Sequence, residues 1–265
     1  MKTEKIYLWN NLEDNEKDNP DIVAYIPEQK ISDCAFVIFP GGGYGVCSAF
    51  SGEAYAEYFV ERGFTCFVVH YRVFPNEFPK PIADGQRAMQ IVRYNAEKWG
   101  IDPNKILAVG SSAGAHLAAT LCTYREFLAF ADDEIAKIDF VPNAQVLCYG
   151  VLNLANDYAH KGSGKNLLGD RFEELAASLS PDLIADEKTP PAFVWHTMAD
   201  DIVPVENALE YVKRLSAMKV KTELHIFPDG FHGKGLSQDN DKVSVHKRQW
   251  LDLFFTWLKY MDFLA

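Results

Sequence analysis

Six short apolar runs, each followed by a stretch of helical periodicity, constrain the fold of this chain more than any other feature. The runs are rich in β-branched and aromatic residues and are apolar at nearly every position, which is typical of strands buried on both faces. They span residues 34–39, 66–71, 105–109, 145–149, 192–196 and 222–227. Such alternation predicts an α/β fold with a mostly parallel central sheet and helices on both faces.

Helical periodicity fills the intervals, over residues 52–62, 81–98, 113–124, 205–218 and 243–260. Residues 22–26, which end at Pro27, could add an antiparallel edge hairpin before the first run. A chain of 265 residues suits one α/β domain, and no Pro- or Ser-rich linker or internal repeat marks a boundary. We therefore expect a single domain over residues 1–265.

Two stretches interrupt the alternation, residues 126–140 and 153–188. Both follow predicted strands or helices on the carboxyl side of the sheet, where open α/β sheets bind their ligands. We expect these insertions to form a small cap over the site. The alternative is that they are surface loops and a peripheral helix without a functional role.

The charge balance restricts the partners of the chain. It has 26 Lys and Arg residues against 37 Asp and Glu residues, a formal net charge of −11. Such a surface repels phosphate backbones and anionic lipid headgroups. We expect no binding to nucleic acid or to a membrane surface. The expected partner is a neutral or cationic small molecule, with a homo-oligomer as a further possibility.

The cysteines and the N-terminal residues indicate a compartment. The five cysteines lie in apolar stretches without a CxxC pair, which favours free thiols in a reducing environment. The N-terminal residues include no apolar signal-peptide core, and no stretch approaches about 18 consecutive apolar residues. The expected location is the cytoplasm.

A Gly-x-Ser-x-Gly sequence lies where the third predicted strand runs into a helix. Its central residue is Ser112, between Gly110 and Gly114. A sharp strand-to-helix turn strains the central residue, and the glycines remove Cβ atoms that would clash. This turn would expose Ser112 Oγ and place the Ala113 N–H at a helix N-terminus, where it can stabilise an oxyanion. The pattern predicts Ser112 as a nucleophile, whereas Ser111 is out of register.

A serine nucleophile needs a base, and one of the seven histidines has a suitable position. His232 lies in a Gly-flanked loop directly after the last predicted strand, where a triad histidine is needed. His160 and His246 lie in polar stretches and are expected to face solvent. The others lie in or beside predicted strands and helices and are expected to be packed: His70, His116, His196 and His225.

The acid that orients this base is expected in the loop after the predicted strand at 192–196. Asp200 and Asp201 both qualify by position, but two neighbours in a turn cannot both orient His232. The chain order Ser, Asp, His is that of α/β-hydrolases. The residues alone leave the choice between the two acids open.

A second group of backbone donors is expected after the first predicted strand. Pro40 is followed there by Gly41, Gly42, Gly43 and Tyr44, and missing side chains let N–H groups approach a ligand oxygen. A phosphate loop is the alternative, but the chain lacks Gly-x-Gly-x-x-Gly after a strand and a Gly-Lys-Ser/Thr ending. No HExxH sequence and no His/Cys cluster indicates a metal, so we expect neither a metal nor another cofactor.

Several motifs occur together between about residues 34 and 260. They are Pro-Gly-Gly-Gly-Tyr at 40–44, Tyr-Arg at 71–72, Trp-Gly-Ile-Asp-Pro-Asn-Lys-Ile at 99–106, Gly-x-Ser-Ala-Gly at 110–114 with His-Leu-Ala at 116–118, Ser-Pro at 180–181, Trp-His-Thr at 195–197 with Asp-Asp-Ile-Val-Pro at 200–204, and Phe-Pro-x-Gly-x-His-Gly at 227–233. This combination resembles the bacterial acetyl-esterase and acetylxylan-esterase-like branch of the α/β-hydrolases.

The resemblance assigns roles that the residues alone leave open. In that family the acid is the Asp of Asp-x-x-Val-Pro, which implies Asp200 rather than Asp201. The family's oxyanion glycines correspond to Gly42 and Gly43, with Ala113 as the further donor. The resemblance also implies short acyl groups, acetyl above all, carried on sugars or similar alcohols.

We therefore expect a cofactor-free serine carboxylesterase that acts on a small-molecule ester through Ser112, His232 and Asp200. Tyr44 could line a sugar site, although aromatic residues near strand ends are more often part of the core. One alternative is a serine peptidase or formamidase, because the same triad cleaves amides. Another is a catalytically silent binding protein with the same fold, which would typically lack a triad member.

Overall fold

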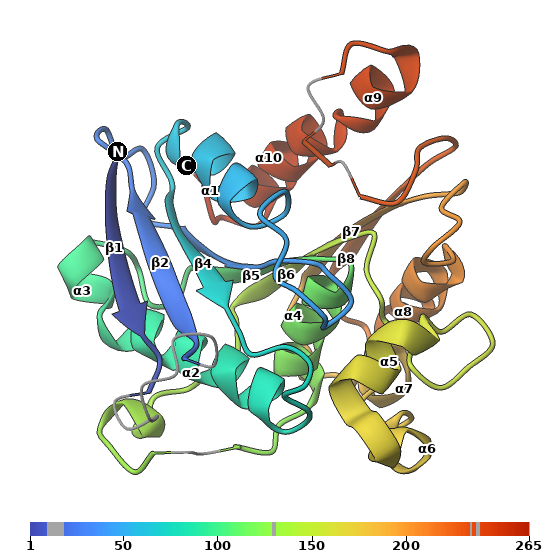
Figure 1. Ribbon diagram of the computed structural model, residues 1–265. Coiled ribbons are helices and arrows are strands. Elements are labelled where there is room, and N and C mark those ends of the chain that lie inside the picture. The colour runs from blue at the N-terminus through green and yellow to red at the C-terminus, as the bar shows by residue number, and fades with distance from the viewer. Residues whose placement is uncertain (10–18, 129–130, 234, 237–238, 265) are drawn as a thin grey trace.

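A central sheet of eight strands organises the chain (Figure 1). The computed structural model describes residues 1–9, 19–128, 131–233, 235–236 and 239–264. The strands lie in the order β1-β2-β4-β3-β5-β6-β7-β8. Their bounds are Lys2–Tyr7 (β1), Asp21–Ile26 (β2), Ala35–Phe39 (β3), Thr65–His70 (β4), Ile106–Ser111 (β5), Ala144–Cys148 (β6), Ala192–Thr197 (β7) and Thr222–Phe227 (β8).

Strands β3 to β8 run parallel, and β2 pairs antiparallel with both β1 and β4. All six predicted strands are present, with bounds within two residues of those expected from the sequence. The antiparallel hairpin also forms, with β1 as its outer strand. The prediction of an α/β-hydrolase fold with a mostly parallel sheet is confirmed.

Within the described residues, ten α-helices follow or flank the strands. They are Glu53–Val60 (α1), Lys80–Tyr94 (α2), Ala96–Trp99 (α3), Ala113–Thr123 (α4), Lys161–Leu168 (α5), Phe172–Leu175 (α6), Pro181–Ile184 (α7), Glu206–Ala217 (α8), Lys242–Lys247 (α9) and Trp250–Tyr260 (α10). Among the described residues, no helix combines the length and apolarity needed to cross a bilayer.

Two predicted helices are each divided in the structure. The helix expected over 81–98 breaks at Asn95, whose backbone leaves the helical region with φ −97° and ψ 18°. Asn95 Nδ2 also donates to the carbonyl oxygen of Ile91, a side-chain bond that competes with the helical ladder. The helix expected over 243–260 is divided into α9 and α10.

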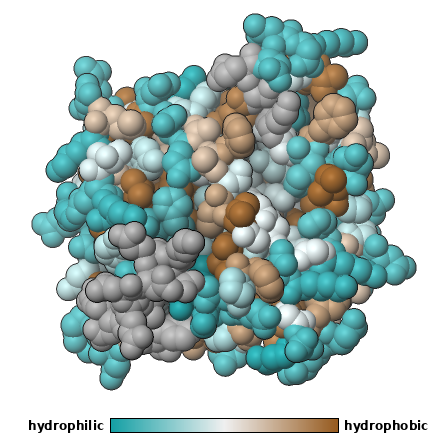
Figure 2. All heavy atoms as spheres, viewed as in Figure 1, coloured by the Kyte–Doolittle hydropathy of each residue, from teal (hydrophilic) through white to brown (hydrophobic). Residues whose placement is uncertain are grey.

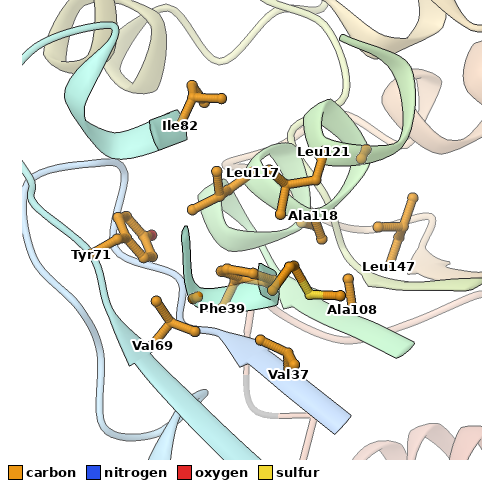
Figure 3. Close-up of a cluster of buried hydrophobic side chains, with 14 of the residues drawn as sticks. Val37, Phe39, Val69, Tyr71, Ile82, Ala108, Leu117, Ala118, Leu121 and Leu147 are labelled. Atoms are coloured by element: carbon orange, nitrogen blue, oxygen red, sulfur yellow. The ribbon is translucent and has the colours of Figure 1, made fainter. Parts of the chain in front are cut away.

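The sheet separates two apolar layers because successive strand residues point to opposite faces. Val37 and Phe39 of β3 pack with Leu117 and Leu121 of α4 in the layer that also includes α2 and α8 (Figure 3). Phe36, the residue before Val37, contacts Phe59 of α1 and Phe254 of α10 in the other layer, with ring centroids 4.9 and 5.6 Å away. Both faces of the central strands are therefore covered by helices.

The first insertion, residues 126–140, packs along α2. Its residues 129 and 130 lie outside the described residues. Arg87 of α2 forms an ion pair with Asp133 at 2.6 Å, and Gln90 Nε2 donates to the carbonyl oxygens of Ala136 and Ile138. The second insertion, residues 153–188, folds into α5, α6, α7 and a short 3₁₀ helix at Gly169–Arg171.

A histidine between two carboxylates links β2, β4 and α1. His70 Nδ1 lies 2.7 Å from Asp21 Oδ1, and His70 Nε2 lies 2.9 Å from Glu53 Oε1. Both ring nitrogens can donate only in the imidazolium form. The hydrogen bond with Asp21, helped by Glu53 and opposed by burial, raises the pKa of His70 above its ordinary value.

We expect His70→Gln to reduce stability more at low pH than at high pH. Because the folded-state pKa of His70 is raised, its contribution is fully present below the unfolded-state value and is lost as pH rises through the folded-state value. Thermal unfolding of both proteins should show a gap at pH 6 that narrows by pH 9. The exposed His246 provides the control variant His246→Gln, and a His70→Gln gap that widens with pH would contradict the assignment.

Candidate active site

The turn between β5 and α4 holds Ser112 in a strained backbone conformation. Its φ is 55° and its ψ is −120°, a region that costs a non-glycine residue about 1 to 3 kcal/mol. Backbone hydrogen bonds tie it to the end of β6 and the segment that follows: Ser112 N donates to Cys148 O at 3.0 Å, and Val151 N donates to Ser112 O at 3.1 Å. The nucleophile-elbow geometry expected from Gly-x-Ser-x-Gly is therefore present.

The flanking glycines are needed because backbone passes very close to both. A Cβ on Gly114 would lie 2.0 Å from the carbonyl oxygen of Phe39 and 2.5 Å from that of Pro40. A Cβ on Gly110 would lie 2.3 Å from the carbonyl oxygen of Gly114 itself. No side chain fits at either position without moving the backbone of β3 or of α4.

Three side chains from three strand-end loops form one hydrogen-bonded chain. His232 Nε2 lies 2.8 Å from Ser112 Oγ, and His232 Nδ1 lies 2.7 Å from Asp200 Oδ2. Residues 112, 200 and 232 follow β5, β7 and β8, whose carboxyl ends meet at one edge of the sheet. The three residues expected from the sequence are therefore brought together.

The structure places Asp200, not Asp201, on the imidazole. The Asp200 side chain is fully buried, and its Oδ1 accepts from the N–H groups of Ile202 and Val203 at 3.0 and 2.9 Å. Burial opposes its charge, but the hydrogen bonds from His196, His232 and the Val203 N–H outweigh it and hold the pKa of the carboxyl well below its ordinary value. Asp201 is exposed.

The glycine loop after β3 passes directly beside Ser112. A Cβ on Gly41 would lie 3.1 Å from Ser112 Cβ. The N–H of Gly41 is already bound to Ser51 Oγ at 2.9 Å. Gly42 and Gly43 have positive φ values of 129° and 63°, and within the described part of the chain their N–H groups donate to no protein acceptor.

Among the described residues, three side chains from outside the loop form hydrogen bonds with its backbone. The Tyr71 hydroxyl donates to Pro40 O at 2.6 Å, Ser51 Oγ accepts from Gly41, and Asn166 Nδ2 donates to Gly43 O at 2.9 Å. Asn166 belongs to α5, so the insertion at 153–188 borders the loop. The N–H of Ala113, in the first turn of α4, completes the group of candidate oxyanion donors because it has no intrahelical acceptor.

Tyr44 does not line the site. Its side chain is fully buried, and its hydroxyl lies 2.8 Å from His116 Nδ1. His116 Nε2 lies 2.7 Å from the carbonyl oxygen of Leu179, so Nε2 carries the proton and Nδ1 accepts from Tyr44. Burial lowers the pKa of His116 to about 4, and the ring therefore stays neutral. The expectation of a substrate contact from this side chain is corrected to a supporting role behind the glycine loop.

Two further residues near His232 had no signal in the sequence. The ring of Tyr149 contacts the imidazole of His232 edge-on, with the two ring centroids 5.1 Å apart. The backbone of Tyr149 has a positive φ of 40°. His160 is half-buried rather than solvent-facing, and its Nδ1 accepts from Ser163 N at the start of α5. Burial, together with the nearby His232, lowers the pKa of His160. Only the tertiary fold brings these residues to the site.

Exposed apolar side chains lie next to the loops of the site. Val46 and Phe50, which follow the glycine loop, are 59% and 88% exposed, and Phe231, which precedes His232, is 77% exposed. On the face drawn in Figure 2, apolar residues gather in the middle, between hydrophilic margins. Among the described residues, no group of three or more His, Cys, Asp or Glu side chains could hold a metal ion.

This arrangement can generate a nucleophile and stabilise an anion. An imidazole that is held by a carboxylate can remove the proton of a serine hydroxyl as that oxygen attacks a carbonyl carbon. Backbone N–H groups next to the hydroxyl can then bind the resulting oxyanion. The chemistry suits acyl transfer.

Comparison with known proteins gives one matching family and several relatives. Residues 21–215 match the family model described as BD-FAE. Endo-1,4-beta-xylanase B of Butyrivibrio fibrisolvens is 32% identical over 83% of this chain and 35% of that protein. Acetylxylan esterase of Xylanibacter ruminicola is 30% identical over 95% of this chain and 47% of that protein. The chain thus spans between a third and a half of the length of these curated relatives.

Solved structures show the same architecture over nearly the whole chain. An acetyl ester-xyloside bifunctional hydrolase from Caldicellulosiruptor lactoaceticus is 37% identical, with a TM-score of 0.89, and covers 99% of this chain and 97% of its own. A thermophilic esterase from Thermogutta terrifontis is 26% identical, with a TM-score of 0.81, and covers 99% of this chain and 94% of its own.

The close packing at the elbow predicts opposite effects of two glycine-to-alanine substitutions. Gly114 and Gly162 are each the second residue of a helix, α4 and α5. A Cβ on Gly162 would meet only His160, at 3.4 Å or more. We expect Gly114→Ala to lower the free energy of unfolding by about 1 to 3 kcal/mol or more. Gly162→Ala should leave it unchanged or raise it by up to about 1 kcal/mol.

Chemical denaturation of the two variants and the wild type measures this difference. The expected order of denaturation midpoints is Gly114→Ala below the wild type, and Gly162→Ala at or above it. A Gly114→Ala protein as stable as the wild type would show that β3 does not approach the elbow this closely.

Proposed function

The chain belongs to the BD-FAE family of α/β-hydrolases, and on this premise we propose that it hydrolyses carboxylic esters through Ser112, His232 and Asp200. The observation that carries the proposal is the continuous hydrogen-bonded chain from Ser112 Oγ through both nitrogens of His232 to Asp200. Relatives named as esterases are consistent with this chemistry.

In the first half-reaction Ser112 Oγ attacks the ester carbonyl carbon while His232 Nε2 takes its proton. The carbonyl oxygen becomes an oxyanion, for which the N–H groups of Gly42, Gly43 and Ala113 are the proposed donors. Asp200 stabilises the imidazolium. The tetrahedral intermediate collapses, the C–O bond to the alcohol breaks, and the alcohol leaves with the proton from His232. The acyl group remains on Ser112.

In the second half-reaction water attacks the acyl-enzyme. His232 takes a proton from the water, the tetrahedral intermediate collapses, and Ser112 Oγ leaves as it regains that proton. The products are the free acid and the restored enzyme. No cofactor takes part in either half-reaction.

The proposed substrates carry short acyl groups on sugars or similar alcohols. Two curated relatives are named as an acetylxylan esterase and a xylanase, and a solved relative as an acetyl ester-xyloside hydrolase. The Thermogutta terrifontis esterase has been solved with propionate and with butyrate bound. In this chain, the insertion at 153–188 is the proposed cap because its Asn166 binds the glycine loop and its His160 lies near His232.

A substrate panel tests the proposal. We expect p-nitrophenyl acetate and propionate to be cleaved with higher kcat/KM than the octanoate, and acetylated xylo-oligosaccharides to be deacetylated. Ser112→Ala should abolish these activities and leave the unfolding midpoint unchanged, because the elbow depends on its glycines. Cleavage of aminoacyl anilides in preference to esters would favour a peptidase, and binding of the panel without turnover would favour a silent hydrolase fold.

The two adjacent acids predict a large difference between matched variants. Asp200→Asn removes the charge that stabilises the imidazolium, and in a triad such a change costs about 10⁴ in rate. Asp201→Asn alters an exposed side chain and should fall within the small range of surface substitutions. Steady-state kinetics should therefore show a kcat loss of orders of magnitude for Asp200→Asn, with KM nearly unchanged, and less than about tenfold for Asp201→Asn.

The pair also separates two possible errors. If the effects of the two variants are reversed, the acid is Asp201 and the hydrolase proposal survives. If both variants keep full activity, neither acid orients His232 and the proposed triad is wrong.

A further inference from the structure

Asp200 has a second histidine partner that the mechanism above does not use. His196, in β7, is fully buried, and its Nε2 lies 3.3 Å from Asp200 Oδ2. His232 Nδ1 approaches the same oxygen at 2.7 Å. One carboxylate oxygen therefore faces two imidazoles.

The hydrogen-bonding partners determine where His196 carries its proton. Its Nε2 also lies 2.9 Å from the carbonyl oxygen of Val203. Two oxygens, neither of which can donate in these states, face Nε2, so this nitrogen must carry the hydrogen and share it between them. His196 Nδ1 is buried and has no hydrogen-bond partner among the described residues. His196 thus presents a fixed N–H dipole to the acid.

Both carboxylate oxygens of Asp200 face two N–H donors each, from the backbone of its own turn and from the two histidines. Oδ1 accepts from the N–H groups of Ile202 and Val203, and Oδ2 faces His196 and His232. A carboxylate that is stabilised by more donors attracts each of its partners less strongly. The N–H of His196 therefore weakens the hold of Asp200 on the proton that His232 carries as an imidazolium.

We propose that His196 is a positioning residue of the active site, which fixes Asp200 Oδ2 toward His232 and limits how strongly that carboxylate stabilises the protonated imidazole. This inference rests on the proposed function, because it concerns the base of the same reaction. Its consequence is that loss of the His196 N–H would strengthen the pairing of Asp200 with a protonated His232.

Other groups around His232 are the same in all the variants that test this proposal. Ser112 Oγ lies on Nε2, the Tyr149 ring contacts the imidazole edge-on, and His160 lies nearby. Lys247 Nζ donates to the carbonyl oxygen of Gly233, next to His232.

Two variants of similar size separate the donated hydrogen bond from mere packing. His196→Leu fills the space and removes the N–H. His196→Gln can place an amide N–H where Nε2 lies. The readout is the acid limb of kcat/KM for p-nitrophenyl acetate between pH 5 and 9, which reports protonation of the base in the free enzyme.

We expect the acid limb of His196→Leu to move up by about one pH unit, so that its activity relative to the wild type is about tenfold lower at pH 5.5 than at pH 8.5. His196→Gln should return the limb to within about 0.3 pH units of the wild type. His225→Leu, in the neighbouring strand β8, is the control and should leave the limb in place.

If the acid limb of kcat/KM for His196→Leu coincides with that of the wild type, the proposal is overturned. This holds whether or not the melting temperature of the variant changes. Equal shifts in His196→Leu and His196→Gln would also overturn it, because the N–H would then not be the cause. If His196→Leu does not fold, His196→Asn replaces it, since this shorter amide does not reach Asp200. Full activity of Ser112→Ala would instead refute the proposed function itself.

Discussion

The backbone of Ser112 is the constraint on which the site depends. A φ of 55° is costly for serine, and the residue keeps it because β6 and the segment after β6 bind both its N–H and its carbonyl group. At the same turn, the backbone of β3 lies so close to Gly114 that a Cβ on this residue would be 2.0 Å from the carbonyl oxygen of Phe39. The glycine loop is thereby brought beside the Ser112 hydroxyl. The proposed nucleophile and the candidate oxyanion donors are positioned by one structural feature, the close approach of β3, β5 and α4.

The proposed base, His232, and the proposed acid, Asp200, depend on the adjacent strands β7 and β8. Thr197 Oγ1 donates to Gly230 O at 2.9 Å, and Lys247 Nζ donates to Gly233 O at 2.9 Å, so the His232 loop is held on both sides. Asp200 is held by two backbone N–H groups of its own turn. These contacts leave the imidazole little freedom to rotate, as its proposed role as the base for Ser112 would require.

The sequence predicted the strands well because each is apolar at almost every position, a pattern that only a sheet covered on both faces explains. The strand-end positions of Ser112 and His232 followed from this. The choice between Asp200 and Asp201 did not, because both lie in the same turn and periodicity cannot tell which carboxylate the turn directs inward. Tyr44, His160 and His196 were out of reach for a related reason. Their roles depend on partners that are far away in the chain or on the other side of a tight turn. The residues next to each of them in the sequence do not reveal these partners.

The division of labour between sheet and insertion has a consequence for specificity. The hydrogen-bonded chain from Ser112 to Asp200 is held by strands, by their turns and by Lys247 of α9, whereas Gly43 is held by Asn166 of the insertion at 153–188. Ser163 Oγ, which bonds His160 Nδ1 at 2.8 Å, lies 3.8 Å from a would-be Cβ on Gly43. Substitutions in α5 can therefore move the glycine loop while Ser112, His232 and Asp200 stay aligned. The proposed substrate range could therefore change without a change in the proposed catalytic geometry, because different parts of the chain support the two.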